Sequence, residues 1–323
     1  MVDFKEIKSL EPVPFTLMTS YIGAILALIY AIILLITFGA LAALLPGAAI
    51  IFASLGLSMI ILYPIGTFLV FTALSFITAF IYNMLVPRLG GVKLGLEGDQ
   101  VTSLPVVSFA LILAVVEAIW AFIFGLLMTA VILPLTTIMS TIIPLVSQLV
   151  VTVINNVTAT LSMSNATTIN ATNLTATNLP NGSVVGNGGV VLALMLIIGL
   201  PIAVFIFGFI GNALAAIFYN YLIPKVGGVR LLLASAGTNQ EITSIPVVSA
   251  SLAIAIVALI FGIINGLLQL ISLSATGHAV LGVEILIYDI IRYFVGTFIM
   301  VAIITIIYNF LAPKIGGIQL GLK

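Results

Sequence analysis

Long apolar runs, broken by short polar segments, make up most of this chain. Each run is longer than the roughly 20 residues with which a helix crosses a bilayer. The runs are continuously apolar, whereas the strands of a membrane barrel alternate over about 10 residues. The pattern therefore predicts an all-α transmembrane fold with six spans. We expect them near residues 15–38, 52–85, 105–132, 190–222, 246–272 and 283–311.

A polar-aromatic motif, which we call the cassette, follows every second span. It reads YNMLVPRLGGVKL from Tyr82, YNYLIPKVGGVRL from Tyr219 and YNFLAPKIGGIQL from Tyr308. Three closely similar copies indicate a triplicated chain.

The segments that open each pair of spans also match one another. VTSLPVVS from Val101 recurs as ITSIPVVS from Ile242, and Ile7–Val13 is a looser copy with one additional residue. The predicted domains are therefore three repeat units of two spans each, residues 1–97, 98–235 and 240–323.

Three hairpins in sequence put every repeat in the same orientation. Such parallel repeats are related by an axis along the membrane normal, so we expect the three hairpins to stand around a pseudo-threefold axis. Eight cations fall on one side of the predicted spans, and Arg292 is the exception. The eight are Lys5, Lys8, Arg88, Lys93, Lys225, Arg230, Lys314 and Lys323. By the positive-inside rule that side is cytoplasmic, which puts both termini inside the cell in a multi-pass plasma-membrane protein.

The opposite side carries an uncharged segment rich in Asn, Thr, Ser and Gly, residues 154–189. Its composition is that of a disordered polar loop. It also contains five N-x-S/T sequons, and their position on the predicted external face favours glycosylation. The acceptors are Asn156, Asn165, Asn170, Asn173 and Asn181. Before this loop, residues 134–153 mix polar and apolar positions, which predicts an interfacial or loosely helical segment.

Each cassette has the residues of a structural connection at a membrane surface. An amphipathic tyrosine ring favours the headgroup layer, the asparagine can bond backbone groups freed at the helix end, and proline is expected to end the helix. The glycine pair allows a sharp reversal of the chain. Those residues are Tyr82, Asn83, Gly90, Gly91, Tyr219, Asn220, Gly227, Gly228, Tyr308, Asn309, Gly316 and Gly317.

Strict alternation of apolar and polar residues follows each glycine pair and predicts a short strand. The first strand leads through the turn residues 97–100 to Val101–Leu104, which predicts a β-hairpin on the cytoplasmic face. A second hairpin is expected within 229–245. The last strand, Ile318–Leu322, has no partner downstream, so we expect it to pair with the N-terminal segment Phe4–Leu10.

At these residues the repeat unit resembles a family of short, uncharacterised prokaryotic membrane proteins. Members have an I-x-x-I-x-P opening, two spans, a Tyr-Asn motif and a Gly-Gly-Ile-x-Leu ending. Here the corresponding ends are Ile7–Pro12 and Tyr308–Leu322. The resemblance implies that one unit can exist alone and assemble as an oligomer. It implies no activity, ligand or site residue.

Ionisable residues within spans are costly and often functional. Glu117 lies 12 residues past Pro105, and Asp289 and Arg292 share one face of the last span. One interpretation is that these three charges neutralise one another and fix the docking of the third repeat on the second. The other is an ion or proton path between the two repeats.

Composition narrows the function. The chain is 63% hydrophobic and 6% charged with no net charge, which gives no basic surface for nucleic acid. It has one histidine and no cysteine, and no catalytic or metal-binding motif is present, so we expect neither an enzyme nor a cofactor. The N-terminus lacks the pattern of a signal peptide and is expected to be retained. The expected partners are the lipid bilayer and other membrane or envelope proteins. We favour a structural or accessory membrane component, with an ion or small-solute channel or transporter near Glu117 and Arg292 as the alternative.

Overall fold

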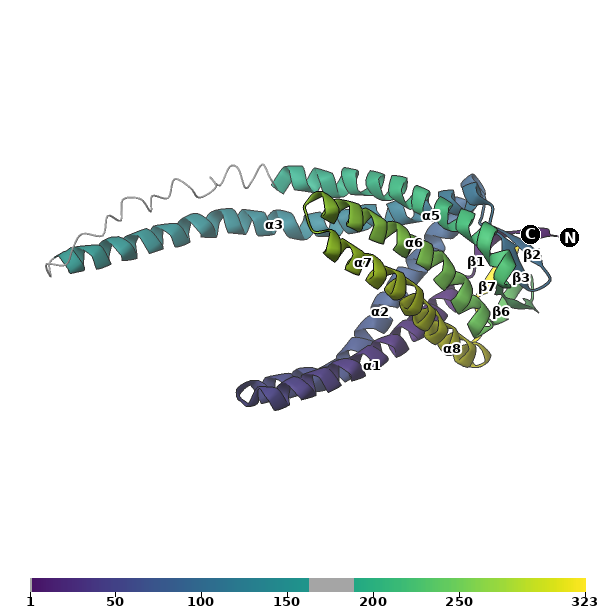
Figure 1. The fold of residues 1–323 in the computed structure, drawn as a ribbon, viewed down its shortest axis with the longest axis horizontal. Coiled ribbons are helices and arrows are strands. Elements are labelled where there is room, and N and C mark those ends of the chain that lie inside the picture. Colours follow the sequence, from purple (N-terminus) through teal and green to yellow (C-terminus); the bar gives the residue numbers. More distant parts are fainter. Residues whose placement is uncertain (1, 163–188) are drawn as a thin grey trace. The chain divides into compact units, whose positions relative to one another are not determined.

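The computed structural model describes residues 2–162 and 189–323 (Figure 1). The chain forms two compact units, one made of Met1–Val116 with Phe209–Lys323 and the other of Glu117–Gly208. The second repeat of the sequence contributes to both units, so the compact units do not coincide with the repeats.

Six helices in the described residues are long and apolar enough to cross a membrane, which confirms the six long apolar helices that the sequence predicts. Their bounds are Pro12–Leu44, Ala49–Leu89, Val106–Leu135, Gly189–Val226, Val247–Ala275 and Ala279–Ile315. Large apolar side chains are exposed along them, including Ile36, Leu62 and Phe207. Such surfaces are compatible with a multi-pass membrane protein, because lipid rather than water would cover them.

The helices α1 (Pro12–Leu44) and α2 (Ala49–Leu89) form the first hairpin, joined by the short helical turn Pro46–Ala48. The last hairpin is α6 (Val247–Ala275) followed by α7 (Ala279–Ile291), a π-helical turn Arg292–Gly296 and α8 (Thr297–Ile315). Both hairpins lie within the first compact unit.

Two glycines one helical turn apart bring the last hairpin together. A Cβ atom on Gly262 would lie 2.8 Å from Cβ of Tyr293, and one on Gly266 would lie 2.9 Å from Cα of Leu286. Small residues at this spacing let helix backbones approach closely in membranes. They bring α6 and α7 near enough for a hydrogen bond between side chains of the two helices.

The second unit consists of most of α3 (Val106–Ser162) and the start of the helix that becomes α5 (Leu200–Val226), with a π-helical turn at Met195–Gly199. The two helices cross closely, since a Cβ on Gly125 would lie 2.1 Å from the carbonyl oxygen of Leu196. The segment 134–153, expected to be interfacial or loosely helical, is a continuous part of α3.

The strands join into one antiparallel sheet, so the expectation of an all-α fold with separate short hairpins is corrected. The order is β4-β3-β2-β1-β7-β6-β5. Bounds are β1 Asp3–Leu10, β2 Lys93–Glu97, β3 Gln100–Ser103, β4 Val229–Arg230, β5 Leu232–Ala236, β6 Asn239–Ser244 and β7 Gln319–Leu322. The sequence pattern predicts each strand but does not show that neighbouring hairpins also share backbone hydrogen bonds.

The strand pairs that the sequence predicts are all present. Hairpins β2–β3 and β5–β6 form, and β1 at the N-terminus pairs with β7 at the C-terminus. Glu6 and Lys323 exchange backbone hydrogen bonds of 2.8 and 3.0 Å, and Figure 1 shows the two chain ends near each other. The ends of the sheet are also connected, because only Leu231 separates the edge strands β4 and β5.

Residues at matching positions form the three buried clusters where helices meet the sheet. Met18 packs with Tyr308, Ile112 with Tyr82, and Ala253 with Tyr219. Met18, Ile112 and Ala253 each follow the end of their opening segment (Leu10, Leu104, Ile245) by eight residues, and each is at most 1% exposed. In every case the first helix of one repeat packs on the second helix of another.

Candidate functional site: the Tyr-Asn joint

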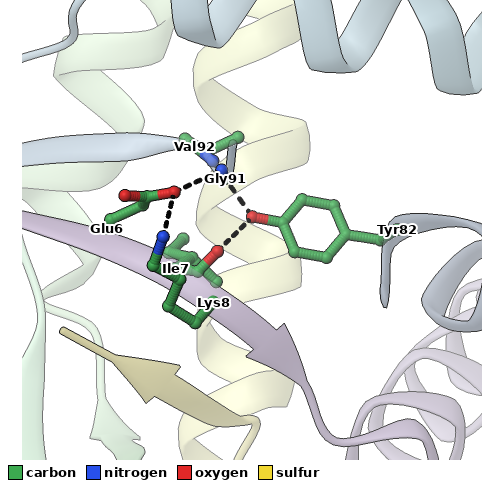
Figure 2. Close-up of polar contacts among 6 residues, drawn as sticks. All are labelled: Glu6, Ile7, Lys8, Tyr82, Gly91 and Val92. Atoms are coloured by element: carbon green, nitrogen blue, oxygen red, sulfur yellow. Dashed lines mark hydrogen bonds and ion pairs between the residues drawn. The ribbon is translucent and has the colours of Figure 1, made fainter. Parts of the chain in front are cut away.

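The tyrosine hydroxyl of the cassette is inserted between two strands (Figure 2). The two residues of a hydrogen-bonded pair in an antiparallel sheet exchange two N–H···O bonds. Ile7 donates its N–H directly to the carbonyl of Val92 at 2.9 Å. The return bond is bridged by Tyr82, whose hydroxyl accepts from the N–H of Val92 at 3.1 Å and donates to the carbonyl of Ile7 at 2.8 Å. We call this arrangement, with the adjacent asparagine, the Tyr-Asn joint.

The other two copies make the same bonds. Tyr219 accepts from the N–H of Val229 at 3.2 Å and donates to the carbonyl of Val101 at 2.7 Å. Tyr308 accepts from Ile318 at 3.0 Å and donates to Ile242 at 2.5 Å. Each hydroxyl therefore connects three parts of its own repeat. These are the strand before the first helix (the opening strand), the strand after the second helix (the closing strand) and the second helix itself.

The asparagine next to each tyrosine binds the end of the opening segment through both atoms of its amide. Asn83 accepts from the N–H of Leu10 and donates to its carbonyl, both at 2.8 Å. Asn220 does the same to Leu104 at 2.6 and 2.7 Å, and Asn309 to Ile245 at 2.9 and 2.8 Å. The amide stands in for a neighbouring strand where the chain turns from the sheet into a helix.

The glycine pair has two separate tasks in the first and third joints. Gly90 and Gly316 have φ of +82° and +85°, a conformation that side chains disfavour. A Cβ on Gly91 would lie 2.0 Å from the carbonyl oxygen of Ile7, and one on Gly317 would lie 2.0 Å from that of Ile242. The first glycine turns the chain, and the second lets backbone touch backbone.

A carboxylate completes the first and third joints. Glu6 accepts from the N–H of Gly91, and Glu241 accepts from the N–H of Gly317, both at 2.6 Å. In the second joint Gln100 occupies the matching position, and its side chain lies against Gly228. The roles of Glu6, Gln100 and Glu241 were not predicted from the sequence. A signal was present, because an acid or its amide directly precedes the first Ile or Val of the opening segment in all three copies.

Lys8 lies beside the first carboxylate, with its ammonium 2.8 Å from Oε1 of Glu6. The hydrogen bond from Lys8, followed by the one from Gly91, holds the pKa of Glu6 below its ordinary value of 4.5. Lys8 is the extra residue of a β-bulge between β1 and β7. Thr102 and Thr243 are the extra residues of the matching bulges.

The lowered pKa gives a pH-dependent stability that can be measured. The stabilisation by ionised Glu6 is present above the unfolded-state pKa near 4.5 and is lost as pH falls through the lower folded-state value. The melting temperature of purified protein should therefore fall less steeply below pH 5 in Glu6→Gln than in the unchanged chain. Glu97→Gln, at an exposed residue of β2, is the control. If the melting temperatures of Glu6→Gln and the unchanged chain fall equally below pH 5, the lowered pKa of Glu6 is contradicted.

The joint corrects two expectations, for the asparagines and for the prolines. The tyrosine hydroxyls bind backbone groups of two strands, and the rings are 9%, 7% and 3% exposed; their place in the headgroup layer stays a prediction. The asparagines bind the opening segment instead of the free groups of their own helix end. Pro87 and Pro313 do not end their helices, which continue to Leu89 and Ile315. The helices end at the glycines, because proline removes one N–H but the backbone reverses only at positive φ.

The last hairpin holds a polar cluster within the apolar helices. Asp289 is 3% exposed, accepts from Nδ2 of Asn265 at 2.6 Å and lies 3.1 Å from the guanidinium of Arg292. The Arg292 side chain is half exposed and lies over the ring of Tyr293. Glu117 belongs to the other compact unit, so its predicted contact with Arg292 stays a prediction.

The predicted glycosylation segment is mostly outside the described residues. Asn156 falls within α3, whereas Asn165, Asn170, Asn173 and Asn181 lie outside the residues that the structure describes. Use of the five sequons stays a prediction.

Comparison with protein-family models, curated proteins and solved structures finds no match to this chain. What the joint can do therefore follows from its geometry. Its tyrosine and asparagine groups bind backbone atoms of the same chain, and this ties each helix end to two strands. The arrangement fixes the position of each helix end.

Proposed function

We propose that this chain is a structural or accessory component of the plasma membrane. Three helix hairpins stand around a pseudo-threefold axis on a ring of strands at the cytoplasmic face, and the external segment 154–189 is glycosylated and meets other membrane or envelope proteins. The observation that carries the proposal is the threefold recurrence of the Tyr-Asn joint with the same bonds. In this largely apolar protein, the polar side chains of the joint fix the helix ends through hydrogen bonds to the strands.

Strand pairing supports the pseudo-threefold arrangement. Ser103, Ser244 and Ser9 occupy matching positions in the opening strands. They pair with Gly95, Leu232 and Gly321, which occupy matching positions in the closing strands. Each closing strand thus contacts the opening strand of its own repeat on one side and that of the next repeat on the other. A ring in which every repeat holds its neighbour is suited to a rigid support.

The orientation can be tested with single cysteines, because the chain has none of its own. Asp99→Cys places a thiol in the exposed β2–β3 turn, and Thr276→Cys places one in the exposed turn between α6 and α7. On intact cells a membrane-impermeant maleimide should label the Thr276→Cys variant alone. Asp99→Cys should react only after the cells are permeabilised. Labelling of Asp99→Cys on intact cells would overturn the cytoplasmic placement of the sheet.

One observation favours the alternative, an ion or small-solute path. Asp289 is a buried carboxylate in a candidate span, bonded to Asn265 and Arg292, and such residues often line ion pathways. Reconstitution into liposomes loaded with pH- and cation-sensitive dyes separates the two functions. A support protein should give the same flux as protein-free liposomes. A flux that Asp289→Asn abolishes, while Glu284→Gln on the same helix retains it, would replace the structural proposal.

A further inference from the structure

A cavity of about 340 Å³ lies between the second repeat and the start of the third. One end is lined by Val101 of β3, Val229 of β4 and Leu104, which directly follows β3. The helical walls are Phe109 of α3, Ala215 and Tyr219 of α5, and Ile254 and Val257 of α6. Its volume falls within the range of small-molecule sites, and its lining is almost wholly apolar.

The cavity follows from small residues at positions where the other repeats carry larger ones. Ala215 is four residues before its cassette tyrosine, where the other copies have Thr78 and Ile304. Ala253, in the cluster beside the cavity, matches Met18 and Ile112. The interface between the second and third repeats therefore lacks side-chain volume that the other two interfaces have.

The apolar lining of the cavity favours a hydrocarbon ligand over a polar one. The only polar side-chain atom among the lining residues is the hydroxyl of Tyr219, and it already accepts from Val229 and donates to Val101. An empty apolar space of this size leaves its walls without packing partners. A polar ligand would lose its hydrogen bonds with water and gain none here.

The position of the cavity along the span indicates the source of this hydrocarbon ligand. Ile254 is 43% exposed and lies eight residues past Pro246, or roughly 12 Å along the helix from the sheet end. The cavity thus opens on the apolar surface of a candidate span, in the half of the bilayer nearer the sheet. We infer that it binds one acyl chain of a glycerophospholipid from that leaflet.

The test uses the full chain in nanodiscs containing phosphatidylcholine with a diazirine in its acyl chain. After irradiation, mass spectrometry should find the lipid attached to peptides carrying Phe109 and Ala215. Ala215→Ile, which restores the residue of the third repeat, should remove these adducts and leave those at the exposed Val248. Ala73→Ile on the exposed surface of α2 is the matched control and should keep all adducts.

Melting in delipidated detergent gives an independent readout. Added phosphatidylcholine should raise the melting temperature of the unchanged chain to a plateau. Ala215→Ile should start higher and gain less, because its side chain occupies part of the site. If Ala215→Ile does not fold, Ala215→Val should give intermediate values. The inference would be overturned if a folded Ala215→Ile or Ala215→Val variant kept its lipid adducts at Phe109. It would also be overturned if the unchanged chain formed no adducts there. The crosslinking and melting results are independent of the liposome flux experiment, which tests the structural role.

Discussion

Replacing Gly91 with alanine should destabilise the protein by about 4 kcal/mol or more, because the new methyl group has no room. Its Cβ would lie 2.0 Å from the carbonyl oxygen of Ile7, which is a backbone atom and cannot rotate away. The same carbonyl accepts the hydrogen bond from Tyr82, so moving the strand would also open the joint. The melting temperature of the variant in detergent should fall sharply, and Gly317→Ala should behave alike.

Gly66→Ala is the control for this prediction. Gly66 lies within α2 with nothing within 4 Å of an added Cβ, so the exchange should be neutral or raise stability by up to about 1 kcal/mol through helix propensity. Equal melting temperatures for Gly91→Ala and Gly66→Ala would mean that the strand and the glycine turn do not meet as closely as described.

The spans and strand pairs could be predicted because each depends on local pattern. Apolar length predicts the six helices, and alternation after the glycine pair predicts short strands. Pairing of Ile318–Leu322 with the N-terminal strand followed from leaving no strand without a partner. The merging of the hairpins into one sheet was not predicted, because period-two alternation is the same in an isolated hairpin and in a continuous sheet.

The roles of the cassette side chains could not be predicted for a different reason. A tyrosine at the end of an apolar helix is equally compatible with the headgroup layer and with a buried hydrogen bond. The choice depends on where Ile7 lies, and Ile7 is 75 residues from Tyr82. Leu10, the partner of Asn83, is 73 residues away from it, and Gly91 is 85 residues from Glu6. Recurrence of the motif indicated that it matters, but only the folded chain supplies the acceptors.

The hydroxyl group alone makes the tyrosine essential to the joint. Tyr308→Phe keeps the ring but leaves the N–H of Ile318 and the carbonyl of Ile242 without their bridging partner, at a site 3% exposed. Unsatisfied buried backbone groups cost roughly 1–3 kcal/mol each, so we expect a loss of about 3 kcal/mol. The melting temperature should fall, and amide hydrogen exchange at Ile318 should accelerate. Tyr30→Phe, at a half-exposed ring on α1, should change neither quantity.

The three joints make a stronger prediction together than singly. If they belong to one ring of strands, opening any joint should weaken the same cooperative structure. Tyr82→Phe and Tyr219→Phe should therefore lower the melting temperature about as much as Tyr308→Phe, and each should speed amide exchange in strands of the neighbouring repeat. A large effect from one variant and none from the other two would show that the repeats unfold separately. In that case the sheet would be a set of adjacent hairpins instead of a ring that holds the helices in place.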